Sequence, residues 1–230
     1  MRTRSDSVRY PTLAPVVAAK PDRGPPTVGG SRFDRLAAVV AIIGAVAVVV
    51  ANLVAAWLHP ETGLLADTIS NLAAGQYHWV LDVALVLFGL GMIAVAFGMW
   101  TDALDDRWHW HLGTLLIGLA GLGVIVIALW NEYGDGDAGG VTIHLETVIG
   151  LAVAFTLGSW LVAPGLSRVG TYWAALSVWL GIFWLVAGLA YFFLAPDSLD
   201  GLIERVAAVA MVIWLISMAR FIARVRPIRR

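Results

Sequence analysis

The sequence predicts an all-α polytopic integral membrane protein, with six transmembrane helices in an antiparallel bundle and a short interfacial helix in the first outer loop. Of the 230 residues, 60% are hydrophobic and only 13% are charged. A soluble domain is nearer half apolar and a quarter charged. The apolar residues also gather in six long runs that are nearly free of charge, and basic residues occur in every second connection between the runs.

The N-terminal segment, residues 1–34, differs from the rest of the chain. It holds five of the nine prolines and six basic residues, and it shows no apolar periodicity. This composition predicts a disordered, mildly basic cytoplasmic tail. The transmembrane domain is expected over 35–224, and a basic cytoplasmic C-terminus over 225–230.

The six apolar runs each contain about 20 residues, the length that an α-helix needs to cross the hydrocarbon core of a bilayer. Uncharged runs of this length exclude a β-barrel, whose strands would alternate over about 10 residues. Backbone groups in lipid must be satisfied within their own segment, so the runs are expected to be helices. The runs are 36–58, 79–100, 112–131, 144–163, 172–195 and 203–222.

Basic residues predict the orientation of the helices. Arginine occurs in the N-terminal tail and in the connections that alternate with the arginine-free segments 59–78, 132–143 and 196–202. The positive-inside rule therefore predicts that both termini lie in the cytoplasm. We expect a multi-pass protein of the cell membrane. Tryptophans support these boundaries, because they fall at the expected interfaces. Trp57, Trp79 and Trp130 lie at outer ends, and Trp100, Trp108, Trp110 and Trp173 lie at inner ends.

Composition also narrows the function. The chain has 15 Lys and Arg residues and 16 Asp and Glu residues, which gives a net charge of −1. Nucleic acid is therefore not an expected partner. Cysteine is absent, which excludes disulfides, thiolate metal sites and cysteine nucleophiles. Near the middle of the spans, Asn52 and Ser177 are the notable polar residues, and no ionisable residue occurs there. An ion-coupled transporter or proton pump usually needs such a residue, so this pattern argues against both.

The first outer loop, 59–77, has a helical pattern of its own. Leu65, Ile69, Leu72 and Ala73 recur at helical spacing, while Asp67, Ser70 and Asn71 fall on the opposite face. This pattern predicts a short interfacial helix that lies over the bundle. Its polar face would point either at solvent or into the mouth of the bundle.

Ionisable residues crowd at the outer ends of the helices and define a candidate site. His78 and Asp82 are four residues apart and share one helix face. Asp82 lies about one turn inside the membrane, so a partner is expected, either His78 or Arg205. We call the candidate residues the outer cluster: Asp67, Ser70, Asn71, His78, Asp82, His144 and Arg205.

The outer cluster has two possible interpretations. In one, His78, Asp82 and His144, with Asp67 nearby, bind zinc, and Ser70 acts as a nucleophile or orients a water molecule. In the other, the cluster is a hydrogen-bonded cap in which Arg205 neutralises Asp82. No H-E-x-x-H motif, nucleophile elbow, P-loop or dinucleotide fingerprint is present. The glycine-rich acidic stretch 134–140 lacks the pattern of an EF-hand and is expected to be a flexible turn.

Several short motifs resemble a known family. They are His59-Pro60, the run from Asp67 to Leu72, Gly89-Leu-Gly91, Ile143-His144 and the run from Gly201 to Arg205. Together they are similar to an uncharacterised bacterial domain-of-unknown-function family of six-helix membrane proteins, grouped with DRAM-like proteins. The resemblance covers about 35–222 and implies the six-helix fold and a bacterial inner-membrane location. It carries no activity to this chain.

The residue types of the outer cluster are also similar to those of membrane-embedded ceramidase-like hydrolases, which place three histidines, an aspartate and a serine around zinc. This chain departs from that pattern, because it has six spans and lacks a histidine pair on the last helix. Neither zinc nor catalysis is therefore carried over from that comparison.

These observations favour a non-catalytic binding or accessory protein without a cofactor. Its outer cluster would hold a lipid headgroup, a small molecule or a partner, and its expected partners are the lipid bilayer and a lipid or membrane protein. The first alternative is an outward-facing, zinc-dependent hydrolase of a lipid-like substrate. The second alternative is a small-molecule transporter, which needs a polar route through the bilayer.

Overall fold

A computed structural model describes residues 27–28, 31–58, 63, 65–73, 77–101, 104–105, 107–130, 143–194 and 196–226. Within these ranges, six helices are long and apolar enough to cross a membrane, so the predicted six-helix, multi-pass fold class is confirmed. They are α1 (Arg32–Leu58), α3 (His78–Thr101), α4 (Trp108–Leu129), α5 (Ile143–Leu166), α6 (Thr171–Phe193) and α7 (Asp200–Arg224). A short helix, α2 (Ile69–Ala73), lies in the first loop, and a 3-10 turn, η2 (Asp197–Leu199), precedes α7.

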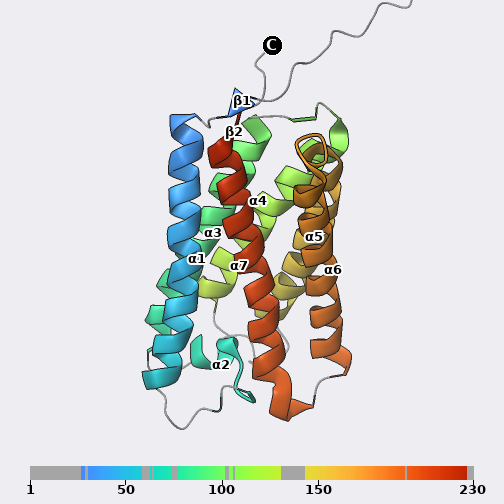
Figure 1. Cartoon of the computed structure of the whole chain (residues 1–230). Coiled ribbons are helices and arrows are strands. Elements are labelled where there is room, and N and C mark those ends of the chain that lie inside the picture. Colours follow the sequence, from blue (N-terminus) through green and yellow to red (C-terminus); the bar gives the residue numbers. More distant parts are fainter. Residues whose placement is uncertain are drawn as a thin grey trace, which may run out of the picture.

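The six long helices form a closed ring. Successive helices pack against one another in antiparallel pairs, and α7 completes the ring by packing against both α6 and α1 (Figure 1). Helix α7 also contacts α3. Because the number of spans is even, the start of α1 and the end of α7 lie at the same end of the bundle, while α2 lies at the opposite end (Figure 1).

A capping box fixes the start of α1. The Ser31 N–H donates to Asp34 Oδ2 at 2.6 Å, and the Asp34 N–H donates to Ser31 Oγ at 3.1 Å. This reciprocal pair satisfies amide donors that the first helical turn leaves without partners. Helix α1 consequently begins at Arg32, three residues before the predicted boundary at 35. Residues 1–26 lie outside the described residues, so the disorder of the tail stays a prediction.

Two short strands join the two ends of the helical region. Strand β1 (Thr27–Val28) pairs antiparallel with β2 (Val225–Arg226), which follows α7 directly. The pairing lies at the end of the bundle where α1 begins (Figure 1). The predicted C-terminal segment 225–230 thus starts with a paired strand, and residues 227–230 lie outside the described residues.

Inside the ring, polar groups are satisfied between helices. Trp214 Nε1 donates to Ser177 Oγ at 2.9 Å, and Ser177 Oγ donates to the Ser159 carbonyl at 2.8 Å. All three residues are fully buried. The chain of bonds joins α7 to α6 and α5, so the mid-span serine identified from the sequence serves packing.

The start of α4 differs from the prediction. Helix α4 begins at Trp108, four residues before the predicted run, and this places Trp110 inside the bundle. Trp110 is 0% exposed, and its Nε1 donates to the Met99 carbonyl at 3.0 Å. Its ring occupies the space that a side chain at Gly165 would fill. The expectation that Trp110 anchors an inner interface is therefore wrong.

The buried carboxylate of Asp105 holds the connection between α3 and α4 in place. Asp105 is almost fully buried and forms an ion pair with Arg168, whose Nη2 lies 2.8 Å from Asp105 Oδ2. Arg168 Nη1 also donates to the Leu104 carbonyl at 3.1 Å. Asp105 thus ties this connection to the segment that follows α5.

Helices α3 and α4 approach each other closely where glycines face across their interface. A Cβ atom at Gly121 would lie 2.7 Å from the Gly89 carbonyl oxygen and 2.9 Å from Met92 Cβ. Contacts this short cannot form without a backbone shift. Small residues are the usual means by which transmembrane helices gain close packing.

Gly121→Ala is therefore expected to lower the free energy of unfolding by about 1–3 kcal/mol, because the added methyl group overpacks the α3–α4 interface. The measurement is thermal or denaturant unfolding of the full chain in detergent. Gly150→Ala is the matched control, because a Cβ atom at Gly150 has nothing within 4 Å. Equal stability of the two variants would contradict the close approach of α3 and α4.

Candidate functional site

The first outer loop is bound to the start of α7 through its backbone. The amide of Gly201 donates to the Ala66 carbonyl at 3.2 Å, and the amide of Leu202 donates to the Leu65 carbonyl at 2.9 Å. These amides belong to the first turn of α7, where the helix itself supplies no acceptor. Glycine at 201 permits this contact, because a Cβ atom there would overlap the Asp67 carbonyl.

The short helix expected in this loop is α2, Ile69–Ala73. Leu72 and Ala73 are buried against residues of α1 and α3, as their spacing in the sequence suggested. The position of α2 at the membrane interface stays a prediction. Asn71 belongs to α2, but its side chain lies outside the described residues.

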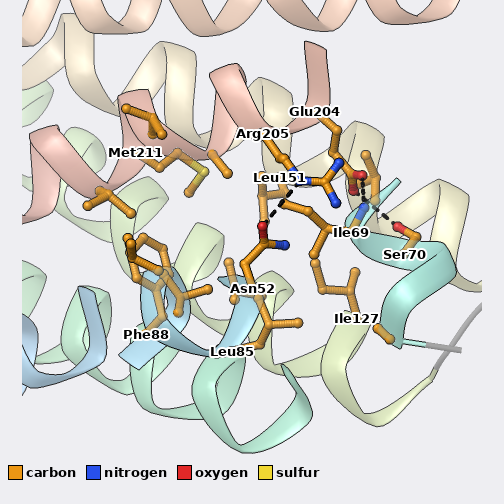
Figure 2. A pocket seen from close by; sticks show the side chains of 18 of the residues that line it. Asn52, Ile69, Ser70, Leu85, Phe88, Ile127, Leu151, Glu204, Arg205 and Met211 are labelled. Atoms are coloured by element: carbon orange, nitrogen blue, oxygen red, sulfur yellow. Dashed lines mark hydrogen bonds between the residues drawn. The ribbon is translucent and has the colours of Figure 1, made fainter. Parts of the chain in front are cut away.

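Glu204 on α7 binds the start of α2. Its carboxylate accepts a hydrogen bond from the Ile69 amide and another, at 3.1 Å, from Ser70 Oγ (Figure 2). The Glu204 side chain thus holds both the backbone of α2, at Ile69, and the hydroxyl group of Ser70. Ser70 is held at the inner face of the loop, toward α7.

Arg205, the neighbour of Glu204, joins three parts of the chain. Its Nε donates to Asn52 Oδ1 on α1 at 3.1 Å (Figure 2). Its Nη1 donates to the carbonyl of Asp67 at 2.6 Å and to the carbonyl of Gly201 at 3.0 Å. The guanidinium group therefore spans α1, the first loop and α7.

His144, at the start of α5, is also close to Ser70. Its Nε2 lies 3.4 Å from Ser70 Oγ, and its Nδ1 lies 3.1 Å from the Trp130 carbonyl oxygen. A carbonyl oxygen only accepts hydrogen bonds, so Nδ1 carries a proton. In the neutral imidazole, Nε2 then presents its lone pair to the Ser70 hydroxyl. We call Ser70, His144 and Glu204 the serine site.

His78 and Asp82 form a separate pair on α3. Their Nδ1 and Oδ2 atoms are 2.7 Å apart, and the two side chains are 50% and 19% exposed. The expected contact within one helix face is confirmed, with His78 rather than Arg205 as the observed partner of Asp82. In the described part of the chain, no three His, Asp or Glu side chains lie close enough to hold a metal ion. The three residues of the zinc alternative are therefore not assembled.

An apolar cavity of about 330 Å³ lies beside the serine site, within the ring of helices. Phe88, Leu151 and Met211 form part of its buried wall, and Asn52, Ser70, Glu204 and Arg205 form its polar end (Figure 2). We call it the first cavity. Its volume is at the lower end of the range of small-molecule sites.

The first cavity opens sideways, toward the surface that faces lipid. Three of its lining residues, Val49 and Leu53 on α1 and Val209 on α7, are themselves exposed. Helices α1 and α7 are neighbours in the ring. The first cavity therefore reaches the outer surface of the bundle at α1 and α7.

A second cavity, also of about 330 Å³, lies among α5, α6 and α7. Leu145 and Phe192 line it and are exposed on the outside of the bundle. The three residues of the serine site line both cavities. Ser70 thus lies where the two cavities adjoin.

The structure divides the outer cluster into two groups. It places Ser70, His144, Arg205 and the backbone of Asp67 at the cavities, and it keeps His78 and Asp82 apart as a pair. The Asp67 carboxylate accepts from the Gly63 amide at 2.7 Å, which is a local bond within the loop. Residues 134–140, the acidic stretch, lie outside the described residues.

Two site residues were missing from the outer cluster, Asn52 and Glu204. The sequence offered a signal for each. Asn52 interrupts an uncharged apolar run, and Glu204 is next to Arg205, a member of the outer cluster. Their contacts could not be found from periodicity alone, because they join residues more than 130 positions apart.

Fold and site together define a six-helix, multi-pass membrane protein with a polar site at the end of two apolar cavities. The chain belongs to the family described as "Protein of unknown function (DUF998)", whose model matches residues 42–220. The predicted membership of an uncharacterised family is thus confirmed, while bacterial origin and the DRAM-like grouping stay predictions. No curated protein and no solved structure matches the chain.

Proposed function

We propose that the protein binds a membrane amphiphile, with the polar head at the serine site and Arg205 and an acyl chain in the first cavity. The observation that carries this proposal is the lateral cavity, which has apolar walls and ends in buried polar groups. A lipid has the same division between an apolar and a polar part. In the bound lipid, the acyl chain would contact Phe88, Leu151 and Met211 in place of neighbouring lipid chains.

The arrangement supports binding from within the bilayer rather than from water. The exposed aliphatic residues at the opening, Val49, Leu53 and Val209, suit contact with lipid chains. Ser70 on α2 and Glu204 and Arg205 in the first turns of α7 lie at one end of the bundle, and Asn52 lies deeper, six residues before the end of α1. The first three groups support a headgroup position near the membrane surface. A lipid could thus move sideways into the cavity and keep its head near the membrane surface.

We also propose that the serine site faces away from the cytoplasm in a cell membrane. Arg107 and Arg168 belong to connections at the end of the bundle where α1 begins and α7 ends, and Arg224 closes α7 there. The described part of the first outer loop, at the opposite end, contains no Lys or Arg. The positive-inside rule supports cytoplasmic termini from this distribution.

The binding proposal is tested by filling the first cavity. Val48→Phe enlarges a partly buried side chain of the cavity wall. We expect it to weaken retention of a two-chain phospholipid, such as dioleoyl phosphatidylethanolamine, about tenfold, equivalent to ~1.4 kcal/mol. Native mass spectrometry of the full chain, incubated with that lipid, measures the fraction of lipid-bound protein.

Val46→Phe is the control for this experiment. Val46 is on the same helix, is exposed and lies outside the first cavity, so its variant should retain lipid like the original chain. Equal retention by both variants, or no retained lipid in the original chain, would contradict the proposal.

A further inference from the structure

We infer that Ser70 and His144 form a nucleophile and general-base pair that transfers the acyl group of a fatty-acyl ester held in the cavities. The inference rests on the proposed function for the seating of the substrate, and it assigns a reaction to that site. Nucleophilic serine needs an adjacent base, and the base needs a third group that orients it. All three elements are present around Ser70.

The geometry supplies the pair and its orienting group. Ser70 Oγ lies 3.4 Å from His144 Nε2, and the Trp130 carbonyl holds His144 Nδ1 at 3.1 Å. The ring is therefore fixed with its basic nitrogen toward the hydroxyl group. Separations somewhat longer than a final hydrogen bond are common before substrate binds. In the structure Ser70 Oγ donates its one proton to Glu204 Oε1 at 3.1 Å, so the hydroxyl group turns from Glu204 to His144 Nε2 before the proton is transferred.

The cavities place a particular class of substrate against Ser70. Ser70 lines both cavities. The polar end of an acyl chain held in either cavity would therefore lie at the serine site. The carbonyl group of a fatty-acyl ester lies at the boundary between its chain and its polar part. That boundary matches the boundary between the apolar walls and the polar end of the first cavity.

A donor for the carbonyl oxygen is also present in the first cavity. Asn52 lines it, and Asn52 Oδ1 is occupied by Arg205 Nε. Asn52 Nδ2 is buried and has no hydrogen-bond partner within the described ranges. An amide N–H is a suitable donor to the negative charge that develops on a carbonyl oxygen during acyl transfer.

The reaction has two steps. Ser70 Oγ attacks the ester carbonyl carbon, its proton passes to His144 Nε2, and the C–O bond to the alcohol breaks as His144 returns that proton to the leaving oxygen. A water molecule then attacks the acyl-serine, again losing a proton to His144. The proton is returned to Ser70 Oγ, and a free fatty acid leaves.

The test uses a long-chain alkyl fluorophosphonate on the full chain in detergent, with peptide mass mapping. We expect covalent labelling of Ser70, no label on that peptide in Ser70→Ala, and labelling at least ~100-fold slower in His144→Gln. Ser198, an exposed hydroxyl group on η2, is the internal reference and should stay unlabelled. Unfolding curves of each variant establish that it is folded.

The outcomes separate this inference from the binding proposal. If the unsubstituted protein is folded and retains phospholipid but Ser70 is not labelled, the inference is overturned and the binding proposal is unaffected. Labelling of Ser198 as fast as Ser70 also overturns it, because Ser70 would then have no special reactivity. Selective labelling of Ser70 in protein that retains no lipid supports the nucleophile and contradicts the binding proposal.

Discussion

Replacing Trp110 by alanine is expected to lower the free energy of unfolding by about 3–5 kcal/mol, the usual cost of removing a fully buried tryptophan. The indole is 0% exposed and fills the space opposite Gly165. Its removal leaves a cavity between α4 and α5, and it also leaves the Met99 carbonyl without the indole donor. Denaturant unfolding in detergent, followed by circular dichroism, measures the loss.

Trp108→Ala provides the matched control, two residues earlier on the same helix. Trp108 is 70% exposed, so its replacement should change the free energy of unfolding by no more than about 0.5 kcal/mol. A loss for Trp108→Ala as large as that for Trp110→Ala would contradict the burial of Trp110 between α4 and α5.

Arg205→Met is expected to lower the free energy of unfolding by about 2 kcal/mol, because three acceptors in different parts of the chain lose a charged donor. The variant should also release the first loop. Hydrogen exchange of the amides of 65–73 should become faster, while exchange within α4 and α5 stays unchanged. Mass spectrometry of exchanged peptides measures both regions in one experiment.

The control for Arg205→Met is Arg224→Met, at the exposed far end of the same helix. It removes an equal charge and should leave exchange in the first loop unaltered. Slow exchange of 65–73 in Arg205→Met would show that Arg205 does not hold the loop to α7.

Local composition was sufficient to predict the six spans. A membrane helix must satisfy its backbone internally and present apolar side chains to lipid, so the length of each apolar run carries most of the information. Helix ends were less predictable. The start of α4 includes Trp108 and Trp110, residues that also suit an interface, and hydropathy alone cannot tell a tryptophan at the headgroups from one packed against a glycine.

The candidate site was predictable only in part, for a related reason. His78 and Asp82 are neighbours on one helix, and their contact follows from spacing. The contacts of Ser70 with His144 and Glu204 join α2 to α5 and α7. Which helices face one another depends on the closure of the ring, and no periodicity within a single helix encodes it.

The closed ring also explains why a polar site can exist in so apolar a chain. Glu204 and Arg205 lie in the first two turns of α7 and bind the first loop, so their charged groups have hydrogen-bond partners instead of lipid contacts. The same contacts hold Ser70 over the cavities. The stability of this end of the bundle and the proposed function therefore depend on the same residues.

Binding of a membrane amphiphile in the first cavity is tested most directly by mapping where a lipid chain contacts the protein. A phospholipid with a diazirine in one acyl chain, irradiated with the full chain in a bilayer, should crosslink to the buried cavity wall at Leu151, Met211 and Val212. These side chains are closed to lipid that merely surrounds the bundle. Crosslinks confined to outward-facing residues such as Val46 and Ile213 would contradict the proposal that a membrane amphiphile occupies the cavity.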